Sequence, residues 1–315
     1  CKMIGQYKPE EFGKEYFRLK GSGQYPMFVA VALGIKPCMD EWIDIKDYDE
    51  FRSMCESYGL HVEPDVVFAR PPKKDKVVGG RNITTTFVSG KRISECDEGD
   101  VHVMVAKSQE VALDAKRYGW YSVVIGNRSI NKPFVDHLRF GKLLGFPGCC
   151  VDFFRRYNDW NRFSHPYETY KNTKRKPSYY CNNFLMDNSF FYIHHLPCSY
   201  SCEKTISYAR EVEKRIEQVE PGFVRKTKEI LQKPLLVFGE RHYIIFDGDM
   251  KGDTISYDDA HYVSNPARPE EDVNFFDEIR QGDSILMKKD IAIRKEGKEI
   301  ARFPNKKEWF MIQFS

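Results

Sequence analysis

Several features that would place the chain in a large class of proteins are missing from its 315 residues. No run approaches the roughly 18 apolar residues that a membrane-spanning helix needs, so no membrane protein is indicated. The opening stretch, CKMIGQYKPEEFGKEYF, has no apolar core of the kind that a signal peptide carries. We therefore expect a cytoplasmic protein.

Motifs of common enzyme classes are missing as well. There is no Walker A sequence, no GxSxG nucleophile elbow and no HExxH zinc-protease motif. GSGQYP near residue 21 lacks the strand, turn and helix that surround a dinucleotide-binding fingerprint. A net charge of +3 is too small to indicate nucleic acid or lipid by itself. Nucleotide-driven and zinc-protease chemistry are disfavoured.

The composition and the pattern of apolar residues predict a mixed α/β fold in three parts. With 41% hydrophobic and 30% charged residues, the chain resembles an ordinary globular protein. We predict an N-terminal α/β segment over 1–90, a central α/β domain over 91–233 and a C-terminal β-rich domain over 234–315. In the last part, strand-like runs alternate with glycine-containing turns, which favours an antiparallel sheet or small barrel.

The central part shows the most regular pattern. VHVMVAKS is typical of a strand, QEVALDAKRYG of a helix and WYSVVIGN of a second strand. This order predicts a β-α-β unit with two parallel strands. NKPFVDHLRFGKLLG then predicts a helix with Pro133 near its first turn and Gly145 at its end.

Nine cysteines, an odd number without the regular spacing of a secreted disulfide framework, indicate thiols or metal ligands. Five are scattered singly, and we interpret them as small buried hydrophobic residues: Cys1, Cys38, Cys55, Cys96 and Cys181. The other four are grouped in two pairs: Cys149, Cys150, Cys198 and Cys202.

Both cysteine pairs are predicted at helix starts. Pro147 precedes Cys149 and Cys150, and Pro197 precedes Cys198 and Cys202 before an amphipathic helix. The partial positive charge of a helix N-terminus stabilises a thiolate. We therefore predict that the two pairs meet in space around an anionic object, with a metal or an iron–sulfur cluster as the natural candidate.

The spacing leaves several kinds of site open. CC with CxxxC matches neither the paired CxxC of zinc sites nor a ferredoxin-like run. The cofactor is either an iron–sulfur cluster, with 4Fe-4S as the leading type, or zinc. Adjacent cysteines rarely share one ion comfortably, so one of Cys149 and Cys150 is expected to bind metal while its neighbour stays reactive. A redox-active disulfide and simple packing remain alternatives.

Two polar residues beside the cysteines are candidates for catalysis. His195 lies three residues before Cys198, within reach as a ligand or as an acid/base, with a structural role as its alternative. Its neighbour His194 is expected to point elsewhere and to be close to neutral on substitution. Asn183, which follows Asn182, is a candidate substrate-binding residue, although capping a turn is the commoner use of such amides.

A basic and aromatic insert over 155–180 separates the two cysteine pairs. Cations that track phosphates and aromatic rings that stack on bases are typical of single-stranded nucleic acid binding. A solvated loop or a lid is the commoner role of such an insert. Its cations are Arg155, Arg156, Arg162, Lys171, Lys174, Arg175 and Lys176, and its rings are Tyr157, Trp160, Phe163, Tyr167, Tyr170, Tyr179 and Tyr180.

The motifs LGFPGCCVDFF, NNFL and HLPCSYSCEKTISYAR resemble the signature of an uncharacterised prokaryotic family, domain of unknown function 483, with its GFPxCC and HxPCSxxC elements. The resemblance covers roughly residues 140–212 and brings no known activity. It implies that the four grouped cysteines belong to one set of motifs. The family-like positions are Gly145, Pro147, Cys149, Cys150, Asn183, His195, Pro197, Cys198, Ser199 and Cys202.

Two functional hypotheses follow. The first is an enzyme that uses a metal or iron–sulfur cluster held by the four cysteines for redox or sulfur-related chemistry on a small molecule or a nucleoside. The alternative is a zinc-stabilised module whose insert over 155–180 binds RNA. No membrane partner is expected under either hypothesis.

Overall fold

The structure is a computed structural model that describes residues 7–10, 12–20, 23–69, 77–78, 81–82, 87–88, 93–95, 98–119, 122–125, 128–131, 135–158, 162–186, 189–239, 242–264 and 270–315. Cys1, Cys96, Pro133 and Trp160, each named in the sequence predictions, lie outside these ranges. The described chain combines helices with antiparallel sheets, which confirms the mixed fold class. None of its helices is both long and apolar enough to cross a bilayer.

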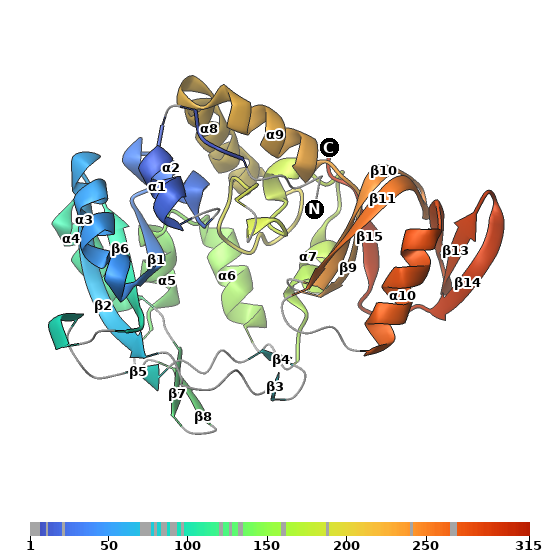
Figure 1. The fold of residues 1–315 in the computed structure, drawn as a ribbon, viewed down its shortest axis with the longest axis horizontal. Helices are drawn as coiled ribbons and strands as arrows, with labels where there is room; N and C mark the ends of the chain where they lie inside the picture. The colour runs from blue at the N-terminus through green and yellow to red at the C-terminus, as the bar shows by residue number, and fades with distance from the viewer. Residues whose placement is uncertain are drawn as a thin grey trace.

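An antiparallel sheet forms the N-terminal end of the molecule (Figure 1). Its strands lie in the order β1 (Cys38–Asp44), β6 (Asp100–Ala106), β2 (His61–Ala69) and the short β5 (Phe87–Val88). Because side chains alternate along a strand, Met39 and Ile43 point into the main core while Cys38 and Met104 pack with α4 (Gln109–Tyr118) on the other face. The sheet therefore draws strands from both sides of residue 90. The smaller elements of this part are α3 (Tyr48–Ser57), η1 (Ile45–Asp47), η2 (Ile93–Glu95) and the strand pair β3 (Val77–Val78) and β4 (Arg81–Asn82).

The predicted parallel β-α-β unit is wrong in its pairing, although its three elements exist. The strand, helix and second strand occur as β6, α4 and β7 (Ser122–Ile125). However, β6 pairs antiparallel with β1 and β2, and β7 pairs antiparallel with β8 (Arg128–Asn131) in a separate sheet. A strand pattern specifies which faces are buried but not which strand is the neighbour, and here the β1 and β2 strands occupy both edges of β6.

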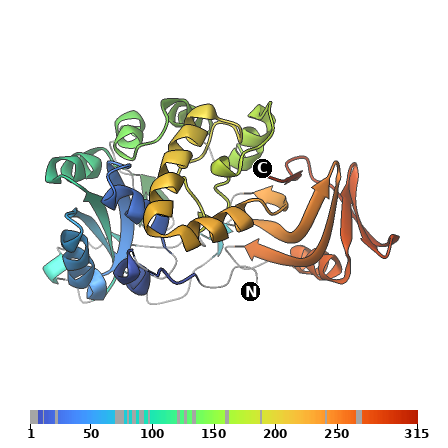
Figure 2. The same cartoon turned by 90° about the horizontal axis from the view of Figure 1, so that it is seen from above.

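Helices fill the middle of the molecule (Figures 1 and 2). The helix predicted from Pro133 begins instead at His137, because the Asp136 side chain caps it by accepting from the Arg139 N–H at 3.0 Å. The central helices are α5 (His137–Leu143), α6 (Gly148–Tyr157), α7 (His165–Asn172), η3 (Tyr179–Cys181), α8 (Glu203–Val219) and α9 (Pro221–Leu231). Above the N-terminal sheet lie α1 (Lys14–Lys20) and α2 (Tyr25–Ala32).

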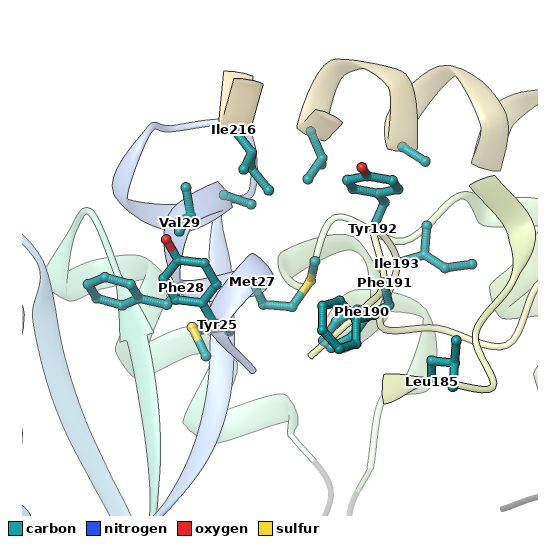
Figure 3. Close-up of a cluster of buried hydrophobic side chains, with 14 of the residues drawn as sticks. Tyr25, Met27, Phe28, Val29, Leu185, Phe190, Phe191, Tyr192, Ile193 and Ile216 are labelled. Atoms are coloured by element: carbon teal, nitrogen blue, oxygen red, sulfur yellow. The ribbon is translucent and has the colours of Figure 1, made fainter. Parts of the chain in front are cut away.

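The main hydrophobic core joins α2, α8 and the segment before α8. Figure 3 shows Met27 of α2 pointing toward Phe190, with Tyr25 of α2, Tyr192 and Ile216 of α8 in the same cluster. All five side chains are at most 2% exposed. Burying several large apolar side chains, each worth about 1.5–3 kcal/mol, anchors the segment that leads into the second cysteine pair.

The C-terminal part is a seven-stranded antiparallel sheet, as the sequence predicted. The strands lie in the order β14, β13, β12, β11, β10, β9 and β15. One face joins the main core through Val237 and Ile245, whereas the other, with Ile244 and Phe246, lies under α10 (Glu270–Gln281). The strand bounds are β9 (Leu235–Gly239), β10 (His242–Lys251), β11 (Thr254–Ser264), β12 (Ser284–Met287), β13 (Asp290–Lys295), β14 (Lys298–Pro304) and β15 (Phe310–Ile312).

Candidate metal centre

The turn before α6 fixes the first cysteine pair. Gly145 has a φ of +73°, which favours glycine, and a side chain there would lie 3.2 Å from Pro37. Pro147 is the N-cap of α6, and its carbonyl accepts from the Cys150 N–H at 2.9 Å. Cys149 and Cys150 therefore lie in the first turn of α6, as predicted.

The second pair is placed by a helix start and by the loop before it. Cys202 is the N-cap of α8, whereas Cys198 lies in the loop four residues earlier rather than on the helix. Side chains of α7 hold this loop: Thr169 donates to the Pro197 carbonyl at 2.9 Å, and Asn172 donates to the Cys198 carbonyl at 2.6 Å. The helix of the basic insert thus helps to position Cys198.

The four grouped cysteines converge, which confirms the central expectation from the sequence. Their sulfur atoms all lie within 4.8 Å of one another. The Sγ atoms of Cys149 and Cys202 are 3.7 Å apart, those of Cys150 and Cys202 are 3.9 Å apart, and those of Cys149 and Cys150 are 4.0 Å apart. Neighbouring cysteines on one helix turn therefore both face the same point. Such a group is able to bind a metal ion or cluster.

Polar groups around the Cys150 sulfur complete the site. The Cys198 N–H donates to this sulfur at 3.4 Å, and the Thr205 hydroxyl lies 3.3 Å from it. The side chains of Cys150 and Cys202 are almost fully buried, while Cys149 and Cys198 are half-buried. One edge of the site is thus shielded by protein and the other lies nearer to solvent.

Without a cation, the sulfurs share protons. The pKa of the Cys202 thiol is lowered because the Cys150 and Cys198 thiols hydrogen-bond to its sulfur. The pKa of Cys150 is raised by its hydrogen bonds to Cys198 and Cys202. Four thiolates this close repel one another, so they ionise together only when a cation lies among them.

His195 contacts the centre indirectly. Its ring is 6% exposed, and its Nε2 atom lies 3.0 Å from the Thr205 hydroxyl. It is not one of the four converging donors, so within the described residues it reaches Cys150 only through Thr205. Burial, together with the charge of Lys36, lowers the pKa of His195 to about 3, which leaves a neutral imidazole. Half-buried His194 packs instead against Phe191 at 6.0 Å between ring centroids.

The two asparagines differ in their environment. Asn182 donates to the Leu231 carbonyl at 2.9 Å and accepts from the Phe184 N–H at 3.1 Å, so its amide supports the backbone. Asn183 is 8% exposed, and no hydrogen bond among the described residues joins it to the four cysteines. Its proposed role with substrate stays a prediction.

Sequence reasoning missed a second group of buried titratable residues beside the centre. Lys36 is 2% exposed, donates to the Leu144 carbonyl, and lies 4.7 Å from the centre of the Phe146 ring. Phe146 in turn packs on His195 at 5.1 Å between ring centroids. Burial lowers the pKa of Lys36 to about 8. The lysine and the imidazole therefore share one aromatic neighbour, Phe146 of the GFP motif.

A separate chain of two carboxylates and an imidazole lies on the N-terminal sheet. His102 is 1% exposed and lies 3.3 Å from Asp40 Oδ2 and 3.4 Å from Asp65 Oδ2. Asp65 sits at the irregularity of β2 between Pro64 and Val67, a feature that redirects side chains. Although burial opposes protonation, the two carboxylates raise the pKa of His102 to about 9. The only sequence signal was a histidine inside the apolar run VHVMVA.

Comparison with known proteins returned no family model, no curated protein and no solved structure that matches the chain. The resemblance to domain of unknown function 483 therefore rests on the motif residues alone.

Proposed function

We propose that the four cysteines hold a single tetrahedrally coordinated metal ion and that zinc is the ion they fit best. The observation that carries this proposal is the spacing of the sulfur atoms, 3.7–4.0 Å for the three pairs among Cys149, Cys150 and Cys202. Four sulfurs at about 2.3 Å from one ion in a tetrahedron lie about 3.8 Å from one another. Cys149, Cys150 and Cys202 therefore already have the spacing that one ion needs, and the Cys198 sulfur lies within 4.8 Å of each of them.

The same distances argue against a four-iron cluster. In such a cluster each thiolate binds a different iron, so the sulfurs surround the whole cluster and lie farther apart, on the order of 6 Å. The Cys149 and Cys150 side chains, on one helix turn, would have to separate by a large fraction of their present distance of 4.0 Å. Both vicinal cysteines serve as ligands under this proposal, in place of the unequal roles expected from the sequence.

The role that fits a closed four-thiolate site is structural. Zinc in catalysis keeps a coordination position for water or substrate, whereas four protein thiolates fill the tetrahedron. The ion would join α6, the loop at Cys198 and the start of α8. The hydrogen bonds from the Cys198 N–H and from Thr205 support the thiolate of Cys150.

We infer further that the protein is a metal-stabilised enzyme acting on a small molecule. Titratable groups with strongly shifted pKa values gather at functional sites more often than elsewhere. Here Lys36, His195 and His102 are all buried. Lys36 and His195 both contact the Phe146 ring, and His195 also contacts Thr205 of the metal centre. His102 contacts Asp40, whose charge acts on Lys36. This group, rather than the metal, is where we place the chemistry.

RNA binding by the insert receives less support. Tyr170 stacks on Phe310 at 4.3 Å between ring centroids, and the Tyr180 hydroxyl donates to Glu213. Arg175 pairs with Glu203, while α7 holds the Cys198 loop. Many of the described side chains of the insert therefore have partners within the chain.

Metal analysis of protein purified without added metal tests the proposal. We expect one zinc per chain and a colourless protein. In matched variants, Cys198→Ser should lose the metal, whereas Cys55→Ala, which alters a buried cysteine outside the group, should keep it. Equal metal content in both variants would refute the assignment.

A further inference from the structure

Lys36 is a buried cation with few partners. Its side chain offers three N–H donors, yet within the described residues it has one hydrogen bond, to the Leu144 carbonyl, and one ring contact, with Phe146. No carboxylate among the residues that the structure describes lies within ion-pair distance of the Lys36 amine. An ammonium group held in this way is costly to bury, which favours the neutral amine. At a pKa of about 8, roughly a tenth of the amine is neutral near pH 7, and this neutral fraction is a nucleophile.

Another titratable group shares a neighbour with this amine. His195 and Lys36 both contact the Phe146 ring, and the charge of Lys36 helps to lower the pKa of His195. When a metal makes Cys150 a thiolate, its sulfur can only accept, so the Thr205 hydroxyl donates to it and accepts from His195 Nε2–H. The other nitrogen, Nδ1, is then a bare acceptor, and it has no hydrogen-bond partner among the described residues.

Asp40 supplies a negative charge. It lies on β1 two residues before Trp42, and its charge raises the pKa of Lys36, which burial lowers. Its Oδ2 atom is fixed by His102, which is itself held by Asp65. The Asp40 side chain is 22% exposed, so a dissolved molecule can reach this end of the group.

We propose that Lys36 is a catalytic residue whose amine forms an imine with the carbonyl carbon of a small aldehyde or ketone. This rests on the proposed enzyme function but not on the identity of the metal. The geometry that carries it is an almost fully buried amine with two unused donors and no ion-pair partner in the described ranges, against a ring, Phe146, that also packs on His195.

The reaction balances without an external oxidant or reductant. The ammonium first gives one proton to water, a loss that its lowered pKa of about 8 makes possible near neutral pH. The amine lone pair then forms a C–N bond while the C=O π electrons move to oxygen, which takes up a proton. Loss of a second N–H proton and departure of the hydroxyl as water leave a C=N bond, which is protonated. The positive charge of the lysine is therefore kept in the iminium product.

The surrounding charges favour a carbonyl over an anion as ligand. Asp40 is negative, and four thiolates around one divalent ion carry a net charge of −2. A carboxylate or phosphate brought to Lys36 would meet this negative field, whereas a protonated imine is stabilised by it. Asp40 therefore helps to stabilise the protonated imine after the C–N bond forms.

Trapping with borohydride tests the proposal on the intact, metal-loaded wild-type protein. The probes are glycolaldehyde and acetone, and peptide mass mapping locates the reduced adduct. The matched control is Lys107, an exposed lysine of the same sheet region. Although Lys36 is far less exposed, we expect at least a tenfold higher adduct yield at Lys36 than at Lys107. In Asp40→Asn, the yield at Lys36 should fall by about tenfold and the yield at Lys107 should not change.

Three results would overturn the proposal: no adduct at Lys36, equal yields at Lys36 and Lys107, or an unchanged yield at Lys36 in Asp40→Asn. Because the wild-type chain is labelled, the result does not depend on whether a Lys36 variant folds. Metal content measured on the same samples separates the two proposals. A zinc-loaded protein without an adduct refutes the imine alone, and an adduct on a protein with another metal refutes zinc alone.

Discussion

The C-terminal sheet and the rest of the molecule differ in what they bury. The core between this sheet and α10 consists of side chains such as Leu236, Ile244 and Phe276. Every buried polar or charged side chain in the described ranges lies instead between residues 36 and 227, including Lys36, His102, His195 and Thr205. Burying polar groups costs free energy unless their partners are well placed. The comparison therefore supports placing the proposed chemistry in the N-terminal and central parts, with the C-terminal sheet in a supporting role.

Removal of the metal should have the largest effect. Chelation under denaturant-free conditions should lower the midpoint of thermal unfolding by more than about 10 °C, because structural zinc sites contribute much of their binding free energy to folding. Circular dichroism during heating measures this. If the C-terminal sheet only supports the fold, the circular dichroism signal of its strands should remain after chelation has disrupted the metal site.

The control is Cys55, a buried cysteine of α3. Cys55→Ala should respond to chelation as the wild type does, whereas Cys202→Ser should unfold at the same temperature with and without chelator. A wild-type protein whose melting is indifferent to chelation would contradict a structural metal.

A matched pair of buried threonines tests the hydrogen bond to Cys150. Thr205→Val removes the hydroxyl that lies 3.3 Å from the sulfur, and should weaken metal affinity by about 10–100-fold. Thr227→Val, on α9, removes a hydroxyl with no partner in the described structure and should leave affinity unchanged. Competition with a chromogenic chelator gives both affinities. Equal affinities in the two variants would show that Thr205 does not support the site.

His102 should make the stability of the N-terminal part depend on pH above about 6.5. Its folded-state pKa, about 9, is raised above the unfolded value near 6.5. The stabilisation is therefore complete below about pH 6.5 and is lost as pH rises through 9. Between these values the unfolding free energy of the wild type should fall by about 2 kcal/mol more than that of His102→Gln. Urea titrations at several pH values measure this, and parallel pH profiles would refute it.

A surface ion pair of the insert should have the smallest effect. Arg175 and Glu203 are both largely exposed, so Arg175→Ala should change the unfolding free energy by less than about 0.5 kcal/mol. If instead this variant and Lys176→Ala together lost binding to single-stranded RNA seen with the wild type, the alternative RNA-binding hypothesis would regain support.

The sequence predicted local structure better than long-range pairing. Pro147 and the helical spacing after Cys202 located the starts of α6 and α8, because capping and amphipathic patterns are local. The neighbours of β6 were predicted wrongly, since strands of similar pattern compete for the same partner. The C-terminal sheet was predictable because its strands follow one another along the chain.

The candidate site shows the same limit. The grouped cysteines were visible because such pairs at helix starts are unusual, whereas a single lysine in GIKPC looks like any surface lysine. Lys36 becomes notable only when Gly145 and Phe146 pack against it from a distant part of the chain. Likewise, Asp65 faces His102 because of a local irregularity in β2 that no residue pattern signals.

The central claim is that four thiolates share one ion, and X-ray absorption at the metal edge, combined with metal counting on anaerobically purified protein, tests it most directly. The account predicts one zinc per chain, a colourless protein and sulfur neighbours alone at about 2.3 Å. A brown protein with several irons per chain, acid-labile sulfide and short iron–iron distances would contradict it.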